Sequence, residues 1–287
     1  MTNDLVLACA TIGAAALGLF LLTSLVIHRL SFGLCNLLAL GIVLGLFTYL
    51  NYVWYDVRLA TLLPFASLVV LGNWLPLFAA MLAAVLRKRL VGQPVRQALF
   101  TGGLTLAGGF ALVQPILGQA PACSTKWDAQ GNCLQTTEFT CSAACAATLL
   151  KQHGIAASEQ EMAELCLTRQ GTSWQGLYRG LKLKTAGSHW DVEVKRCSID
   201  ELRTMAAEKR PIILSVGLAA GQVVDSEYTN EFGWIPGVNH SVILQRYNET
   251  GSAVIADPTM ASCAEHWDRE QMQTLWRGYA VRLVKRS

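Results

Sequence analysis

The sequence predicts an α+β domain that follows an all-α bundle of four transmembrane helices. Residues 1–120 contain four long apolar stretches and few charged side chains, whereas residues 121–287 have the mixed composition of a soluble domain. Within the second part, helix signals come first and strand signals follow, which is typical of an α+β domain with a mostly antiparallel sheet. We therefore expect a domain boundary near residue 120.

The four apolar stretches each have close to the roughly 20 residues that a helix needs to cross a bilayer. They are rich in glycine and alanine, as is typical of membrane helices that pack closely. No Lys or Arg precedes the first stretch, which distinguishes it from a signal peptide, so we interpret it as a retained span. The stretches cover residues 5–27, 32–50, 60–86 and 98–117.

Basic residues in the short loops predict the orientation of these spans. Arg29 follows the first span, and the link after the third span carries Arg87, Lys88, Arg89 and Arg96. The N-terminus and the loop after the second span are nearly neutral. Cytoplasmic loops are the ones enriched in Lys and Arg. We therefore expect a multi-pass protein of a bacterial inner membrane, with the N-terminus and residues 121–287 on the periplasmic side.

Cys123 and Cys133 bracket a short polar loop at the start of the second domain. Asp128, Gly131 and Asn132 in this loop suit a tight reversal. A disulfide between the two cysteines would close the loop and would require an oxidising compartment such as a periplasm. Two free thiols and half of a zinc site are the alternatives, and no Cys-x-x-Cys pair occurs elsewhere in the chain.

Local signals predict the elements of the second domain. A helix over 141–153 ends at Gly154, and Ser158 and Ser198 each have a glutamate three residues later, the pattern of a capping box. Short apolar runs with strand character follow, with a turn at 248–251. The expected helices cover 141–153, a segment from 158, 172–182 and 198–209, and the expected strands cover 212–216, 241–247, 253–256 and 278–284.

Cys141 stands at the start of a predicted helix, where a cysteine nucleophile is favoured. Unpaired N–H groups and the helix dipole stabilise a thiolate at this position. A thiol nucleophile also needs a histidine held beside it and donors for the oxyanion of the tetrahedral intermediate. Gln135 lies six residues earlier in the preceding loop, where its amide can donate to an oxyanion together with the Cys141 N–H.

His240 stands just before one predicted strand, and Asp257 just after the next. Two antiparallel strands joined by a tight turn bring the start of one beside the end of the other, so we expect these side chains within reach of each other. Each residue alone has an ordinary structural explanation. The order Gln, Cys, His, Asp, with each residue at an element boundary, predicts a catalytic site, while His153, His189 and His266 are expected to be structural.

Residues 135–144 resemble the start of a known peptidase family. Their sequence, Gln-Thr-Thr-Glu-Phe-Thr-Cys-Ser-Ala-Ala, is similar to the Gln-x5-Cys-Gly-x-Ala pattern of the bacteriocin-processing peptidases. These are papain-like cysteine peptidase domains, often fused to ABC exporters, that remove double-glycine leader peptides. The resemblance covers about residues 135–285 and continues through residues 171–173, 198–216, 238–244, 254–258 and 276–279.

The resemblance implies a papain-like fold and a role for each candidate residue. Cys141 would be the nucleophile, His240 the general base and Asp257 the acid that orients it. Gln135 would be the oxyanion donor. The chain departs from the family pattern at Ser142, where glycine is usual, and at Thr140, where aspartate is usual. We interpret residues 218–237 as an insertion before the histidine, and the sequence contains no nucleotide-binding motif of the Gly-x4-Gly-Lys-Ser/Thr type.

These observations predict a membrane-anchored cysteine endopeptidase that hydrolyses a peptide bond in a secreted or membrane-associated protein, with leader-peptide processing as one form of that activity. Acyl transfer or transpeptidation on the same Cys-His-Asp site is one alternative, and a non-catalytic membrane scaffold or binding module is another. We expect a peptide or protein substrate, the lipid bilayer and a membrane protein as partners, and no cofactor or metal. The net charge of +3 comes without a long basic run, which argues against nucleic-acid binding.

Overall fold

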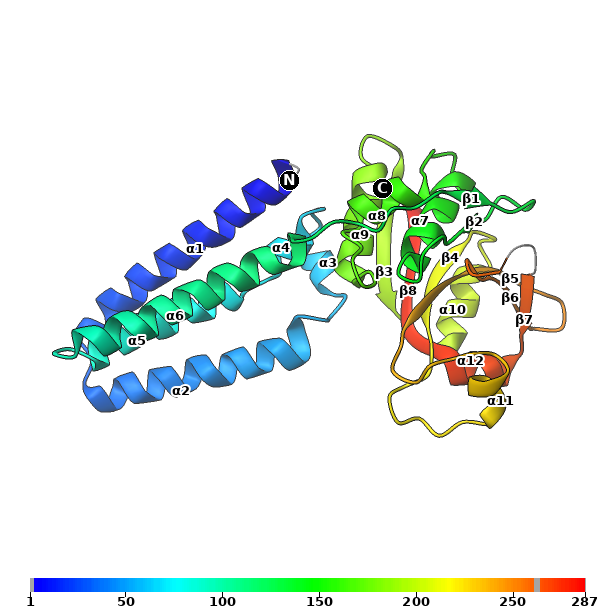
Figure 1. Cartoon of the computed structure of the whole chain (residues 1–287). Coiled ribbons are helices and arrows are strands. Elements are labelled where there is room, and N and C mark those ends of the chain that lie inside the picture. Colours follow the sequence, from blue (N-terminus) through cyan, green and yellow to red (C-terminus); the bar gives the residue numbers. More distant parts are fainter. Residues whose placement is uncertain (1–2, 261–263, 287) are drawn as a thin grey trace. The chain divides into compact units, whose positions relative to one another are not determined.

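The computed structural model describes residues 3–260 and 264–286 (Figure 1). By its internal contacts the chain divides into two compact units, Met1–Leu117 and Gly118–Ser287. The described residues of the first unit form helices and loops, while those of the second form helices and two antiparallel sheets. The predicted α+β class, with apolar helices first, is therefore confirmed.

Long apolar helices make up most of the first unit. The helix α5 contacts α1, α2 and α6, and two short helices, α3 and α4, precede it. Four segments are long and apolar enough to cross a membrane: Asn3–His28, Phe32–Val53, Leu68–Arg89 and Pro94–Ile116. The elements are α1 (Asn3–His28), α2 (Phe32–Thr48), the π-helix η1 (Tyr49–Val53), α3 (Leu59–Leu62), α4 (Leu68–Leu71), α5 (Leu75–Arg89), α6 (Pro94–Val113) and the 3-10 helix η2 (Gln114–Ile116).

The surface of this unit is apolar. Only 17% of the most apolar stretch of α1 is buried. For the segment Pro94–Ile116, only 6% of the corresponding stretch is buried. Leu25, Leu99 and Leu106 are each at least 69% exposed. Soluble proteins rarely expose apolar patches of this extent to water, whereas lipid tails are a suitable solvent for them. The unit therefore has the surface of a membrane protein.

The third predicted stretch, residues 60–86, is interrupted, which differs from the single helix that the sequence suggests. Pro64 and Pro76 lack an N–H donor and disfavour helical backbone before them, so the chain breaks near each. Polar side chains pair the backbone groups at the second break. The Tyr49 hydroxyl donates to the Gly72 carbonyl at 2.6 Å, and the Asn73 amide donates to the Ala111 carbonyl at 2.6 Å.

The described residues of the second unit form six helices: α7 (Cys141–Gln152), α8 (Glu159–Leu165), α9 (Trp174–Lys184), α10 (Ile199–Ala206), α11 (Ser226–Asn230) and α12 (Arg269–Leu275). The predicted capping box of Ser198 and Glu201 is present in full. At Ser158 the serine accepts the Glu161 N–H, and the reciprocal glutamate bond is not formed. Local capping chemistry therefore sets where these helices begin.

The main sheet has six antiparallel strands in the order β3-β8-β4-β5-β6-β7. The predicted strands lie at its centre, and the two edge strands β3 and β7 were not predicted. A separate two-stranded hairpin, β1 and β2, precedes α7. The strands are β1 (Lys126–Trp127), β2 (Cys133–Leu134), β3 (Trp190–Arg196), β4 (Ile212–Val216), β5 (His240–Tyr247), β6 (Ala253–Ala256), β7 (Ala264–Trp267) and β8 (Trp276–Lys285).

Both faces of this sheet are covered by helices. Leu214 and Val242 point into a core that also contains Leu202 of α10 and Leu275 of α12. Neighbouring residues of a strand face opposite sides, so Ser241 faces the other side, where it contacts α7. The centre of β5 is therefore packed on both faces, and its first residue is held rigidly at the sheet's end.

The predicted disulfide between Cys123 and Cys133 is not formed, because both residues are free cysteines in the structure. In the β1–β2 hairpin, Cys133 lies opposite Trp127, while Cys123 precedes the hairpin. The Cys123 N–H donates to the Gln160 side chain at 2.6 Å, and the Cys133 N–H donates to the Thr148 hydroxyl at 2.7 Å. Hydrogen bonds to two helices thus fix this segment without a covalent link.

Leu214→Ala tests the core on the α10 side of the sheet. Leu214 is fully buried, so the substitution removes buried apolar surface and leaves a cavity. We expect the free energy of unfolding to fall by about 2–5 kcal/mol. Thermal unfolding of the full chain in detergent measures the change, and Val223→Ala, at a side chain that is 97% exposed, is the control that leaves stability nearly unchanged. Equal losses of unfolding free energy in the two variants would contradict the burial of Leu214 in this core.

Candidate active site

Cys141 is the first residue of α7 and is half-buried. The N-cap residue is Thr140, whose side chain makes no capping bond and instead bonds to Thr137. Because the first N–H groups of a helix have no partner within it, they are available to stabilise negative charge at Cys141. The departure from the family pattern at Thr140 thus leaves this helix end without a side-chain cap.

His240 and Asp257 are brought together by two adjacent strands. His240 begins β5, and Asp257 directly follows β6, which pairs with β5. The His240 Nε2 atom lies 2.9 Å from Asp257 Oδ1 and 3.0 Å from Oδ2. The Thr259 N–H and hydroxyl both donate to Asp257 Oδ1, at 2.8 and 2.6 Å. The carboxylate is therefore fixed from both sides, and Nδ1 of His240 is left to face Cys141.

The pKa values of these three groups shift in directions that favour an ion pair. Burial alone would raise the pKa of the Cys141 thiol, but the hydrogen bond and positive charge of His240 lower it below its ordinary value. Burial opposes the charged form of His240, yet the bonds to Asp257 and Cys141 raise its pKa to about 10. Burial also opposes ionisation of Asp257, whose pKa is nonetheless lowered, chiefly by His240. The arrangement stabilises a thiolate beside an imidazolium.

The helix that carries Cys141 is bonded directly to the strand that carries His240. The Ser142 and Ser241 hydroxyl oxygens lie 2.8 Å apart in a buried contact. The Cys145 thiol, one turn further along α7, lies 3.2 Å from the Ser241 carbonyl. A glycine at position 142 could not make the hydroxyl contact, so this departure from the family pattern adds a link between the two elements.

Gln135 lies in the loop before α7, beside the acid of the site. Its N–H donates to the Pro258 carbonyl at 2.8 Å, directly after Asp257. Its Nε2 atom donates to the Thr137 carbonyl at 3.1 Å, while its buried Oε1 atom has no partner. Because an amide nitrogen carries two hydrogens, one remains for a ligand.

Glu159 holds the loop that contains Gln135, a role that the sequence did not indicate. Its fully buried carboxylate accepts the Thr136 N–H at 2.7 Å and the Thr136 hydroxyl at 2.8 Å. Glu159 is the first residue of α8, where negative charge also interacts favourably with the helix dipole. The loop before Cys141 is thus anchored on a second helix.

The segment predicted to be an insertion, residues 218–237, contacts His240. The Trp234 ring lies edge-on to the His240 ring at 6.0 Å between centroids, and it also contacts the Trp267 ring at 6.1 Å. A glycine is required where this segment leaves β4: Gly217 has a φ of 140°, and a Cβ there would lie 2.5 Å from the Val238 carbonyl. No signal in the sequence indicated the position of this segment against His240.

The remaining candidates lie away from this site. The His153 Nδ1 atom lies 2.8 Å from the Leu149 carbonyl at the end of α7, and burial lowers the pKa of the imidazole. The His189 ring lies tilted beside the Trp190 ring, at 4.8 Å between centroids. His266 lies in β7. Within the described ranges, no group of three metal-ligating side chains is present.

The fold is similar to solved peptidase domains. The peptidase domain of Streptococcus ComA, a bifunctional ABC transporter of a quorum-sensing pathway, matches at 19% identity and a TM-score of 0.41, covering 53% of this chain and 96% of that one. A putative C39-like peptidase from Bacillus anthracis matches at 18% identity and a TM-score of 0.42, covering 60% of this chain and 100% of that one.

A double-glycine-motif protease from an AMS/PCAT transporter, solved with its leader peptide, matches at 14% identity and a TM-score of 0.39, covering 57% of this chain and 94% of that one. Comparison with curated proteins gives no match. The model of the Peptidase_C39-like family matches residues 128–281, which include Cys141, His240, Asp257 and Gln135. With more than half of its length matched, this chain belongs to the Peptidase_C39-like family.

Proposed function

We propose that this chain is a membrane-anchored cysteine endopeptidase in which Cys141 is the nucleophile, His240 the general base and Asp257 the orienting acid. The observation that carries the proposal is the hydrogen-bonded His240–Asp257 pair next to a thiol of lowered pKa at a helix N-terminus. Perturbed pKa values of this kind are typical of catalytic groups. The match to a cysteine peptidase family supports the same chemistry.

In the proposed mechanism, the Cys141 thiolate attacks the carbonyl carbon of the scissile peptide bond. The Cys141 N–H and the remaining Gln135 Nε2 hydrogen donate to the oxyanion that forms. His240 gives its proton to the leaving amine nitrogen, and the amine departs. A water molecule then loses a proton to His240 and attacks the thioester, which releases the carboxylic acid and regenerates the thiolate.

Apolar side chains around the site support a substrate with apolar residues near the scissile bond. Phe139 precedes Cys141 by two residues and is 41% exposed, and Val238 precedes His240 by two residues and is 53% exposed. Met260, whose N–H donates to the Asp257 carbonyl, is 47% exposed. We propose that these side chains contact apolar residues of a peptide, which suits a leader segment or a membrane-associated protein.

We further propose that the peptidase unit lies outside the cytoplasm. The Lys88 ammonium donates to the Ile27 and Leu30 carbonyls, so the link after α1 and the end of α5 lie at the same end of the helical unit. Both carry the basic residues that favour the cytoplasmic side, namely Arg29, Arg87, Lys88 and Arg89. With four spans, the N-terminus and the peptidase unit then lie on the opposite side.

Selective alkylation tests the ion pair of Cys141 and His240. Because His240 lowers the pKa of the Cys141 thiol, we expect iodoacetamide to label Cys141 at a pH where ordinary thiols react slowly. Cys145 is the internal control, since burial raises the pKa of its thiol. His240→Ala removes the positive charge that lowers the pKa of Cys141, while the thiol stays buried. Labelling of Cys141 should therefore require a higher pH. Peptide mapping by mass spectrometry reads the modified residue, and equal labelling of both cysteines would contradict the ion pair.

Cleavage of a peptide library by the full chain in detergent tests the activity. We expect Cys141→Ala to lower the cleavage rate by at least about 10³-fold, because it removes the nucleophile. The active form needs ionised Cys141 and protonated His240. Activity should therefore decline at low pH as Cys141 gains a proton, and at high pH near 10, the pKa of His240.

The control for this experiment is Cys145→Ala, which alters the next turn of α7 without touching the proposed nucleophile. An added amine separates hydrolysis from acyl transfer, because only transfer yields an amide product. Cleavage that survives in Cys141→Ala would overturn the proposed mechanism and favour a non-catalytic role for this site.

Fusions to alkaline phosphatase test the orientation, because that reporter folds only in the periplasm. We expect high phosphatase activity for a fusion after Ser287 and low activity for a fusion after Gln93, in the basic link between α5 and α6. A reporter that folds only in the cytoplasm, fused at the same two positions, should give the reverse pattern. High phosphatase activity after Gln93 together with low activity after Ser287 would contradict the proposed side.

A further inference from the structure

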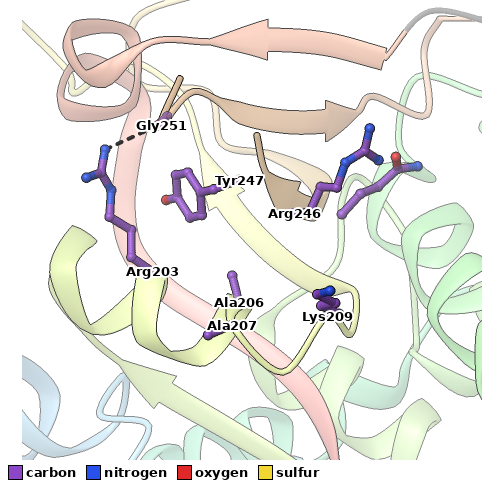
Figure 2. A pocket seen from close by; sticks show the side chains of 8 residues that line it. Arg203, Ala206, Ala207, Lys209, Arg246, Tyr247 and Gly251 are labelled. Atoms are coloured by element: carbon purple, nitrogen blue, oxygen red, sulfur yellow. Dashed lines mark hydrogen bonds between the residues drawn. The ribbon is translucent and has the colours of Figure 1, made fainter. Parts of the chain in front are cut away.

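A cavity in the peptidase unit, Gly118–Ser287, lies at the end of β5 that is opposite to His240 (Figure 2). It has a volume of about 580 Å³ and lies between α10, the turn before β4 and the end of β5. His240 is the first residue of β5 and Tyr247 the last. At about 3.3 Å per residue, the two ends of the strand are roughly 23 Å apart, so this cavity is separate from the candidate active site.

Positive charge dominates the polar lining of the cavity. Arg203, Lys209 and Arg246 come from three different segments, and the wall contains no carboxylate. Among the described residues none of these three cations makes an ion pair. Cations gathered around one cavity repel each other unless an anion lies between them. The lining is therefore electrostatically complementary to a negatively charged group.

Two polar atoms in the wall are buried, the Nε of Arg203 and the hydroxyl of Tyr247. The Arg203 guanidinium lies over the Tyr247 ring at 5.1 Å, and its Nη2 atom donates to the Gly251 carbonyl at 3.2 Å. These contacts hold both side chains in place. Arg203 and Tyr247 therefore form one fixed, polar wall of the cavity.

The positions of the cations favour a phosphate group over a planar carboxylate. Figure 2 shows Arg203 and Tyr247 on one side of the cavity and Lys209 and Arg246 on the other. Phosphate carries up to two negative charges and presents oxygens in several directions, which suits donors on opposite walls. The cavity is also larger than a phosphate group, so a substituted phosphate fits it.

We propose that this cavity, lined by Arg203, Lys209, Arg246 and Tyr247, binds the phosphate group of a small ester or of a lipid headgroup. Arg203 and Arg246 provide the planar guanidinium groups that bind phosphate oxygens in pairs, and Lys209 adds a point charge. The Tyr247 hydroxyl donates to a further oxygen. The site is independent of the proposed peptidase chemistry, because none of its residues touches Cys141, His240 or Asp257.

Calorimetric titration of the full chain in uncharged detergent tests this site with inorganic phosphate. The double substitution Lys209→Gln/Arg246→Gln changes two exposed side chains and should weaken phosphate binding by about tenfold or more. Adding Tyr247→Phe to this double variant removes one hydroxyl and should weaken phosphate binding further. Arg269→Gln, at an exposed cation outside the cavity, is the matched control and should leave binding unchanged, as should Cys141→Ser.

Soluble short-chain phosphatidylglycerol, titrated in the same way, distinguishes the two sources of the phosphate. Binding of phosphatidylglycerol that is lost in the double variant, with weak binding of inorganic phosphate, supports the site and assigns it to a lipid headgroup. Strong binding of inorganic phosphate that is lost in the double variant, with weak binding of phosphatidylglycerol, also supports the site and assigns it to a free phosphate ester. The proposal is overturned if neither probe binds, if Arg269→Gln weakens binding as much as the double variant does, or if an oligoglutamate peptide binds more tightly than either probe.

Discussion

The pairing of β5 with β6, together with the docking of α7 on β5, is the constraint on which the candidate site depends. The tight turn between the strands returns the chain so that the end of β6 lies beside the start of β5, and Asp257 reaches His240 at 2.9 Å. The contact between Ser142 and Ser241 fixes α7 to the same strand, one residue from His240. A shift of any of these elements by one residue would separate the thiol, the imidazole and the carboxylate.

Burial and charge act against each other at this site, and their balance determines its chemistry. Removal from water disfavours every charged group in the triad, yet the three charges alternate in sign and are close enough to offset that cost. Thr259 and the helix N-terminus stabilise the two negative ends. Trp234, at the edge of the His240 ring, covers the imidazole with an apolar surface that strengthens these interactions.

The two units use apolar residues in different ways. In the peptidase unit, the apolar residues of β4 and β5 lie between helices. In the helical unit, many large apolar side chains face outwards, and backbone groups at the break near Pro76 are paired inside by Tyr49 and Asn73. Backbone groups in a lipid environment need such internal partners, because no water is present to replace them.

Local signals in the sequence predicted the class of the fold, the four apolar helices and the central strands, because these depend on local periodicity, capping and composition. It also indicated Cys141, His240, Asp257 and Gln135, since each stands at the boundary of an element with a local signal. The edge strands β3 and β7 were not predicted, because their polar and mixed sequences acquire strand structure only by pairing with β8 and β6.

Contacts between residues far apart in the chain could be found only in the folded structure. The bond from Glu159 to Thr136, the Ser142–Ser241 contact and the position of Trp234 against His240 have no local signal in the sequence. The same holds for the free state of Cys123 and Cys133, which depends on the register of the hairpin. The physical reason is common to all: a side chain's partner is set by how the elements pack, which local propensity does not encode.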